Sequence, residues 1–174
     1  MNIILIGMKG AGKSMIGSLL ARSCSMTFIE VDRRIEKKFE QMMGTQYSCR
    51  EIYQKKGREY FRNLEIQVLT ELGGVQSSVI SSGGGLPLHT KNQRMLKKLG
   101  TIIFLDEQFD IIADRIQKTS VPAFIKNKNN VLPELQKRYH LRKAIYQHIA
   151  DHTVVCTNQT PHEIVDEIAT LIKL

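Results

Sequence analysis

Short apolar runs alternate with longer amphipathic stretches along the whole chain. The runs are rich in Ile and Val and predict strands over 2–7, 27–32, 77–82, 101–106 and 152–157. Apolar residues at helical spacing predict helices over 13–22 and 33–43, one or two helices over 49–72, and a last helix from Thr160. Buried strands separated by helices are typical of a parallel sheet that is covered on both faces. The pattern therefore predicts a doubly wound α/β fold with a five-stranded parallel sheet.

The start of the last helix is the most clearly marked boundary. Thr160 is a favourable N-cap, Pro161 suits the first turn, and Glu163 can reach back to the cap. No repeat or linker divides the chain, so residues 1–174 are predicted to form a single domain. The stretch 117–130 is polar, rich in Asn and Lys and poor in periodicity, and loops of this length often act as lids.

The composition is typical of an ordinary globular protein, with 42% apolar and 24% charged residues among 174. No apolar stretch is long enough for a membrane span, and we expect neither a membrane partner nor a signal peptide. Cys24, Cys49 and Cys156 are scattered and fit a reducing cytoplasm better than a disulfide framework. The net charge of +8 suits anionic ligands, but no aromatic residues interleave with the basic clusters to stack bases. We therefore expect small anions, and no nucleic acid, as partners.

Residues 7–14, GMKGAGKS, match the phosphate-binding pattern G-x-x-x-x-G-K-[ST] between a predicted strand and a predicted helix. Backbone N–H groups and the helix N-terminus favour an anion in such a loop. We expect Lys13 to reach the β- and γ-phosphates and the Ser14 hydroxyl to bind Mg²⁺. The chain is therefore predicted to be a P-loop protein that binds a nucleoside triphosphate. The N-K-x-D pattern that reads guanine is missing, since residues 127–130 lack the Asp, and a small-molecule kinase is the economical interpretation.

Acceptor residues are expected at the same edge of the sheet. Asp32, at the end of the second predicted strand, can accept a hydrogen bond from an attacking hydroxyl, and Glu30 can hold the Mg²⁺ water shell. Arg62 and Glu65 lie three residues apart on a predicted helix, so Glu65 can orient Arg62 toward a substrate carboxylate. Asp32 as a helix cap and Arg62 with Glu65 as a surface ion pair stay open as alternatives. The glycine triplet 83–85 lets a small polyol or acid approach the backbone.

Together, these motifs and a later one resemble shikimate kinases. The family pattern has a P-loop, D-x-D after the second strand, G-E-x-x-F-R-x-x-E, G-G-G after the third strand and R-x-P-L-Y-x-x-x-A-D before the last. This chain has GMKGAGKS, EVD, GREYFRNLE, SSGGG and RKAIYQHIAD in the same order, over nearly its whole length. The resemblance implies a P-loop NTPase fold of the nucleoside monophosphate kinase kind, with three α/β/α layers. It also implies Mg²⁺- and ATP-dependent phosphorylation of the 3-hydroxyl of shikimate, in aromatic amino-acid (chorismate) biosynthesis.

The resemblance further implies which residues form the site. Lys13 and Asp32 would be catalytic, with Asp32 on the shikimate hydroxyls. The implied shikimate-binding residues are Asp32, Arg62, Gly84 and Arg142, with Arg62 and Arg142 on the carboxylate. The implied ATP-binding residues are Gly10, Ala11, Gly12, Lys13, Ser14, Met15, Arg115 and Gln159. Ser14 would bind the Mg²⁺, with Ser81 nearby. On the residues alone, Arg142 could face solvent and Gln159 could be a plain turn residue. Members of the family are usually monomeric, so we expect a monomer.

Four departures from the family pattern bear on function. Glu30 replaces the usual first Asp, and Arg58 replaces a Glu at a position expected to face solvent. The segment 33–62, implied to be the substrate-binding subdomain, is a few residues longer than usual. Val121 stands directly before Pro122, where the family has an Arg that closes on the phosphates. Losing an arginine of this kind costs on the order of 10³-fold or more in phosphoryl transfer.

Three hypotheses follow from the missing lid arginine. Lys118 or Lys126 could substitute for it, the enzyme could be slow, or the chain could bind ATP and ligand without turnover. Compensation or a slow enzyme is favoured, because the other implied site residues are all present. The main prediction is a shikimate kinase. The alternatives are a P-loop kinase of another small polyol or acid, suggested by the longer segment 33–56, and a silent binding protein.

Overall fold

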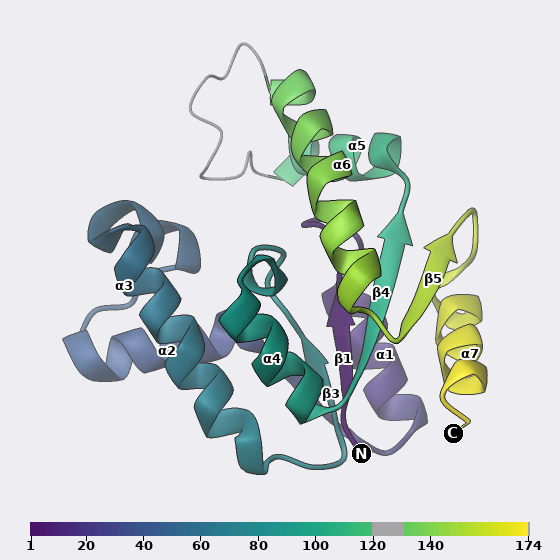
Figure 1. The fold of residues 1–174 in the computed structure, drawn as a ribbon, viewed down its shortest axis with the longest axis horizontal. Coiled ribbons are helices and arrows are strands. Elements are labelled where there is room, and N and C mark those ends of the chain that lie inside the picture. The colour runs from purple at the N-terminus through teal and green to yellow at the C-terminus, as the bar shows by residue number, and fades with distance from the viewer. Residues whose placement is uncertain (120–130, 174) are drawn as a thin grey trace.

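The computed structural model describes residues 1–119 and 131–173. Its centre is a parallel five-stranded sheet in the order β2-β3-β1-β4-β5 (Figure 1). The strands are β1 (Ile3–Ile6), β2 (Thr27–Glu30), β3 (Ser78–Ser81), β4 (Thr101–Glu107) and β5 (His152–Cys156). Ile4 in the central strand is aligned with Ile80 on one side and with Ile102 on the other. The predicted sheet is confirmed.

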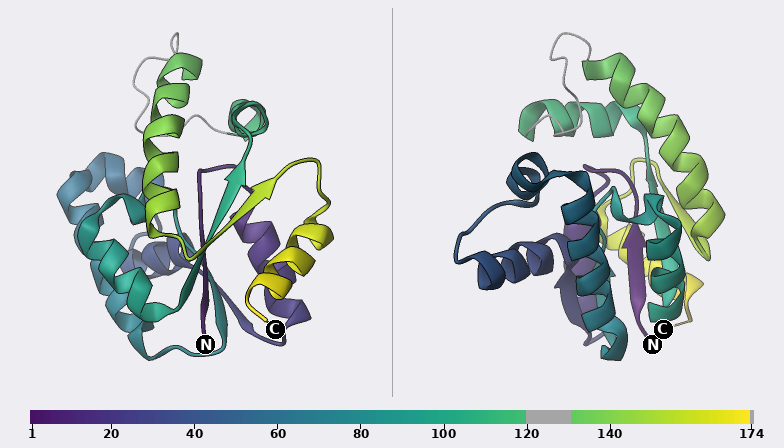
Figure 2. Two further views of the ribbon diagram at one scale, coloured as in Figure 1. Left: turned by 45° about the vertical axis from the view of Figure 1, so that its right-hand side comes forward. Right: turned by 60° about the vertical axis from the view of Figure 1, so that its left-hand side comes forward.

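Helices cover both faces of this sheet (Figure 2). They are α1 (Lys13–Ser23), α2 (Val31–Met43), α3 (Cys49–Glu71), α4 (Thr90–Leu99), α5 (Phe109–Thr119), α6 (Val131–Ile149) and α7 (Pro161–Leu171). Short 3₁₀ turns lie at Leu72–Gly74 and Leu86–Leu88. The buried residues form two clusters, one shared by the sheet with α1 and α7, the other by the sheet with α2, α3, α4, α5 and α6. The three-layer α/β/α arrangement is therefore confirmed.

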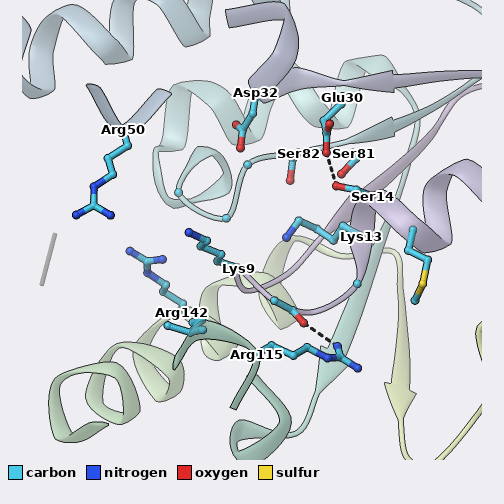
Figure 3. Close-up of a pocket in the computed structure, with 17 residues that line it drawn as sticks. Lys9, Lys13, Ser14, Glu30, Asp32, Arg50, Ser81, Ser82, Arg115 and Arg142 are labelled. Atoms are coloured by element: carbon cyan, nitrogen blue, oxygen red, sulfur yellow. Dashed lines mark hydrogen bonds between the residues drawn. The ribbon is translucent and has the colours of Figure 1, made fainter. Parts of the chain in front are cut away.

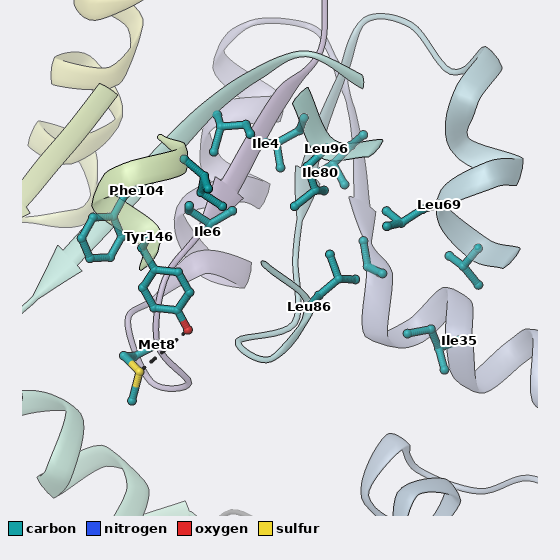
Figure 4. Packing of buried hydrophobic residues seen from close by; sticks show 14 of the residues in the cluster. Ile4, Ile6, Met8, Ile35, Leu69, Ile80, Leu86, Leu96, Phe104 and Tyr146 are labelled. Carbon is teal, nitrogen blue, oxygen red and sulfur yellow. Dashed lines mark hydrogen bonds between the residues drawn. The ribbon is translucent and has the colours of Figure 1, made fainter. Parts of the chain in front are cut away.

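The larger cluster extends to the loop after β1, where Tyr146 lies beside Met8 (Figure 4). Ile4, Ile80 and Leu96 are fully buried in it, and burying one such side chain contributes roughly 1.5–3 kcal/mol. Tyr146 of α6 is also fully buried, and its hydroxyl donates to the Gly84 carbonyl oxygen at 2.6 Å. Burial raises the pKa of Tyr146 to about 12, so the hydroxyl keeps its proton for this bond. The core thus holds the glycine loop after β3 in place.

One predicted boundary is wrong, and the stretch predicted as one or two helices over 49–72 is confirmed with an interruption. The second strand was expected to run to residue 32, but β2 ends at Glu30 and α2 begins at Val31. Asp32 therefore lies in the first turn of α2, where the helix dipole stabilises a carboxylate. The stretch 49–72 forms α3, and its backbone is interrupted at Gly57, where φ is 85° and ψ is 172°. Two helical segments thus meet at Gly57.

Other sequence predictions have mixed outcomes. The capping box of α7 is confirmed, because Thr160 Oγ1 accepts from the Glu163 backbone N–H and Glu163 Oε2 accepts from the Thr160 N–H. No helix was predicted over α4, which is largely polar and buries only Asn92 and Leu96. Residues 117–119 of the predicted lid form the end of α5. The rest of that lid, including Val121 and Lys126, lies outside the described residues.

The order of the strands reverses at β1. From β1 the chain moves to one side for β2 and β3, and then to the other side for β4 and β5. Ligands of open parallel sheets bind at such a reversal, beyond the carboxyl ends of the strands. The loops after β1, β2 and β3 are therefore where the site is expected. Within the described part of the chain, no helix is both long enough and apolar enough to cross a bilayer.

Candidate active site

The loop between β1 and α1 folds around its own lysine. Lys13 Nζ donates to the carbonyl oxygens of Gly7, at 3.0 Å, and Met8, at 2.8 Å. Gly10 and Gly12 have φ of 89° and 85°, in the left-handed region that favours glycine. Burial lowers the pKa of Lys13 to about 8, and an anion in the loop would raise it again. The loop therefore suits a bound phosphate, because the anion would stabilise the charged form of Lys13.

A cavity of about 770 Å³ opens above this loop (Figure 3). It gathers residues that are far apart in the sequence, from the loop after β1 to the middle of α6. The predicted site residues among those lining it are Gly10, Gly12, Lys13, Ser14, Met15, Asp32, Ser81, Gly84, Arg115 and Arg142. Arg142 therefore faces the site, and the alternative that it only faces solvent is wrong.

Oxygen atoms suited to Mg²⁺ lie on one side of this cavity. The Ser14 hydroxyl donates to Glu30 Oε1 (Figure 3). Ser81 and Ser82 are each 2% exposed, and Ser82 Oγ has no hydrogen-bond partner within the described residues. Residues 1–119 and 131–173 contain no cluster of three or more His, Cys, Asp and Glu that could hold a metal alone. That is normal for Mg²⁺ beside a nucleotide, because phosphates and water supply most of its ligands. These residues fit the ion.

Asp32 enters the cavity from the first turn of α2. Burial raises the pKa of its carboxyl, while the charges of Lys13 and Lys9 oppose that rise. A Cβ atom at position 83 would lie 2.3 Å from Asp32 Oδ1, so only glycine leaves room for the carboxylate. Cys49 Sγ donates to the Asp32 carbonyl oxygen at 3.3 Å and ties α3 to α2 beside it. Asp32 is thus placed to accept a hydrogen bond from a hydroxyl in the cavity.

Arg62 is held by a buried carboxylate and keeps an unused donor. Arg62 Nη1 donates to both carboxylate oxygens of Glu65 at 2.5 Å. Glu65 is 3% exposed and also accepts from Asn92 Nδ2 at 3.2 Å. Burial raises the pKa of Glu65, while Arg62 and Asn92 oppose the rise. Arg62 Nε is buried and has no partner among the described residues. The surface-pair alternative is therefore wrong, and a bound anion would complete the geometry of Arg62.

Arg62 and Arg142 both line a second cavity, of about 360 Å³. Arg50, Arg142 and Gly85 line this cavity and the larger one, so the two adjoin. Arg58 lies at the rim and is exposed, as expected from the sequence. A small acid could therefore place its carboxylate between Arg62 and Arg142 while its hydroxyls approach the larger cavity.

A third cavity, of about 170 Å³, lies beside the phosphate loop. Arg115 and Gln159, the two residues expected at adenine, both line it, together with Ala11. Arg115 Nη1 donates to the Gly10 carbonyl oxygen at 2.7 Å, which ties α5 to the loop (Figure 3). Gln159 Nε2 donates to Glu167 Oε2 at 2.7 Å. The structure thus brings the two distant residues to one cleft next to the loop.

Sequence reasoning missed Lys9, Arg50 and Ser82, which all line the main cavity. Lys9 left a signal, because it is a second lysine inside the phosphate loop. Arg50 left none, since its place depends on how α3 packs beside α2. Lys118, a candidate substitute for a lid arginine, donates to Asp114 at 2.8 Å and does not line the cavity.

A sequence model of the family described as shikimate kinase matches residues 9–173. The chain belongs to the shikimate kinase family. A shikimate kinase of Persephonella marina is 33% identical over 172 residues, which is 99% of this chain and 99% of the relative. The crystal structure of shikimate kinase from Aquifex aeolicus vf5 matches with a TM-score of 0.77 and 33% identity, covering 99% of this chain and 96% of that chain.

A shikimate kinase from Acinetobacter baumannii, solved in complex with shikimate, has a TM-score of 0.84 to this structure. It is 26% identical, and the match covers 99% of this chain and 92% of that chain. The family resemblance and the P-loop kinase fold predicted from the sequence are therefore confirmed. The roles of the individual site residues stay predictions, now with a geometry that can be tested.

Proposed function

We propose that this chain transfers the γ-phosphoryl group of ATP to the 3-hydroxyl of shikimate, in the route to aromatic amino acids. One observation carries the proposal: the phosphate loop lines one cavity, and Arg62, held by the buried Glu65, lines the adjoining one. A phosphoryl donor and a small carboxylic acid can therefore be held side by side. Membership of the shikimate kinase family supports shikimate as that acid.

Each residue has a defined task in this reaction. The backbone of the loop and Lys13 bind the phosphates, and Arg115 with Gln159 borders the adenine. Ser14 and Glu30 would hold Mg²⁺, which supplies charge neutralisation for the phosphates when bound.

On the acceptor side, Arg62 and Arg142 bind the carboxylate of shikimate, and the backbone around Gly84 borders its ring. Asp32 accepts the hydrogen bond from the attacking hydroxyl and receives its proton as the bond to phosphorus forms. The raised pKa of Asp32 suits this task, because a base works best when its pKa is not far below the working pH.

The proposal includes the organisation of the chain. The segment 33–62 is the substrate-binding part, 117–130 is a lid, and the whole chain forms one domain. We place the enzyme in the cytoplasm, which the three free cysteines support. We also propose a monomer, because members of the shikimate kinase family are usually monomeric. Light scattering on the purified protein measures its mass and so tests whether it is a monomer.

The direct test is an ADP-release assay with shikimate and Mg-ATP. We expect shikimate-dependent turnover, and we expect Arg62→Met to raise the KM for shikimate far more than the KM for ATP. Arg94→Met, on the exposed face of α4, is a matched control that should leave both unchanged. No shikimate-dependent ADP release at high enzyme concentration contradicts the proposal. Shikimate binding in calorimetry without turnover would instead support the silent binding protein.

A second candidate is a kinase of a different small hydroxylated acid. The second cavity favours it, because Arg50, Arg58 and Arg138 line the cavity in addition to the two arginines that one carboxylate requires. An acceptor with more negative charge than shikimate would use them. A panel of hydroxylated mono- and dicarboxylic acids in the same assay separates the two candidates by kcat/KM.

A further inference from the structure

The phosphate loop carries a second lysine that the reaction described above does not use. Lys9 lies between Met8, which is 2% exposed, and Gly10, whose carbonyl oxygen accepts from Arg115. Its backbone nitrogen would lie only 3.1 Å from a Cβ atom at position 84, so the glycine loop closely supports this part of the main chain. The backbone at Lys9 is therefore held by the buried Met8, by the bond from Arg115 to Gly10 and by the packing of Gly84.

The side chain reaches into the larger cavity on its acceptor side. Figure 3 shows Lys9 extending toward Arg142 and Arg50, whereas Lys13 lies next to Ser14. The two lysines thus occupy different parts of the cavity. A nucleotide held by Lys13 and an acceptor near Asp32 would both lie in the cavity that Lys9 also lines.

The charges of Lys9 and Asp32 influence each other across the larger cavity. Desolvation by its surroundings and the nearby charge of Arg50 lower the pKa of Lys9, while Asp32 opposes this. Lys9 in turn opposes the rise in the pKa of Asp32. Lys9 is exposed in the open cavity, and its charge would act more strongly on a neighbouring anion once bound substrates displace water from the cavity.

We propose that Lys9 is a further catalytic residue, whose ammonium group donates a hydrogen bond to a non-bridging oxygen of the phosphoryl group during its transfer. The bond between the γ-phosphorus and its bridging oxygen to ADP breaks, and the acceptor oxygen forms the new bond to phosphorus. The acceptor proton goes to Asp32, and Lys9 keeps its own proton throughout. This inference rests on the proposed kinase function, but not on shikimate being the acceptor.

Lys9 suits this task for a physical reason. Negative charge spreads over the three non-bridging oxygens as the phosphoryl group passes between donor and acceptor, and fixed cations at that point accelerate the reaction. Removing one preorganised donor of this kind typically costs 10²–10³-fold in kcat. The other described lysine suggested for this task, Lys118, is bonded to Asp114 and does not line the cavity.

The first test compares Lys9→Met, Lys9→Arg and Lys97→Met. Methionine keeps most of the length of the side chain without its charge, and arginine keeps the charge. Lys97 is an exposed lysine on α4 and serves as the matched control. In the ADP-release assay we expect Lys9→Met to lower kcat on the order of 10²-fold with both KM values within about threefold. We expect Lys9→Arg to recover most of the loss and Lys97→Met to match the wild type, with thermal melting showing that all three fold.

The second test needs no acceptor. ADP with aluminium fluoride imitates the planar phosphoryl group in transfer, and calorimetry measures how much the fluoride tightens ADP binding. We expect Lys9→Met to lose most of this gain while it binds ADP alone as the wild type does. If Lys97→Met behaves as Lys9→Met does, the effect is one of net charge and the inference is wrong.

Other results overturn the inference as clearly. It is wrong if Lys9→Met keeps kcat within threefold of the wild type, or if the loss falls on the KM of either substrate alone. It is also wrong if aluminium fluoride tightens ADP binding equally in the wild type and in Lys9→Met. A wild type without shikimate-dependent turnover would contradict the proposed function, and the fluoride experiment would then decide on Lys9 independently.

Discussion

A side chain at position 83 would collide with Asp32, and this makes a sharp prediction. A Cβ atom on Gly83 would lie 2.3 Å from Asp32 Oδ1 and 3.2 Å from its Cγ. Ordinary contacts of a Cβ atom begin near 3.4 Å. Gly83→Ala therefore has to displace the carboxylate by about 1 Å, a shift of the size that misaligns a reacting group.

The displacement should affect catalysis and spare the fold. Oδ1 is the end of a side chain that can rotate, and the backbone at Gly83 does not need a left-handed φ. A misplacement of about 1 Å costs on the order of 10²-fold in rate. That loss corresponds to about 2.7 kcal/mol in the activation free energy. We expect kcat of Gly83→Ala to fall on the order of 10²-fold, with the KM for ATP and the melting temperature close to those of the wild type.

The ADP-release assay and thermal denaturation together check this prediction. Gly73→Ala is the matched control, because a Cβ atom there meets nothing within 4 Å. The reasoning is refuted if Gly83→Ala keeps kcat within threefold of the wild type. It is refuted as well if the variant loses activity only because it unfolds, since the contact would then serve stability alone.

Neighbouring groups should respond differently. In Gly84→Ala the added Cβ would lie 3.1 Å from the backbone nitrogen of Lys9 and would displace the phosphate loop. We therefore expect the KM for ATP to rise several-fold. An unchanged KM for ATP would show that the loop tolerates the added methyl group. Glu65→Gln removes the charge that orients Arg62, so the KM for shikimate should rise about tenfold with little change in that for ATP. Because burial lowers the pKa of Lys13 to about 8, its charge is lost as the pH rises through that value. We therefore expect kcat/KM for ATP to fall above pH 8, whereas a flat profile to pH 9.5 would show that another group carries the charge.

The fold was predictable because its signals are local. Apolar runs such as Ile3–Ile6 are buried on both faces of a parallel sheet, and each leaves a continuous pattern in the sequence. The phosphate loop was predictable for the same reason, since one short segment supplies its backbone donors, Lys13 and Ser14. Helix α4 was missed because its buried side has only Asn92 and Leu96, and α5 and α6 were missed as well.

The acceptor side was predictable only in part. Arg62 and Glu65 are three residues apart, so their pairing could be expected, but their burial against Asn92 depends on how α3 packs on α4. The place of Arg50 depends on the Gly57 interruption and on the loop before α3, neither of which has a periodic signal. Asp32 was identified although its element was wrong, since a strand end and a helix start place it at the same edge of the sheet.

Two of the three consecutive glycines also constrain how this protein can change. A Cβ on Gly83 would collide with Asp32, and a Cβ on Gly84 would press on the backbone of the phosphate loop, whereas a Cβ on Gly85 would only reach ordinary contact with Arg62 Nη2 at 3.4 Å. Gly83 and Gly84 therefore border different parts of the site, the acceptor side and the nucleotide side. An inhibitor that bridges the nucleotide and acceptor sites across this segment would contact a surface with little freedom to mutate. Substitutions that weaken the inhibitor would then have to occur at other positions, where they leave the activity of the enzyme intact.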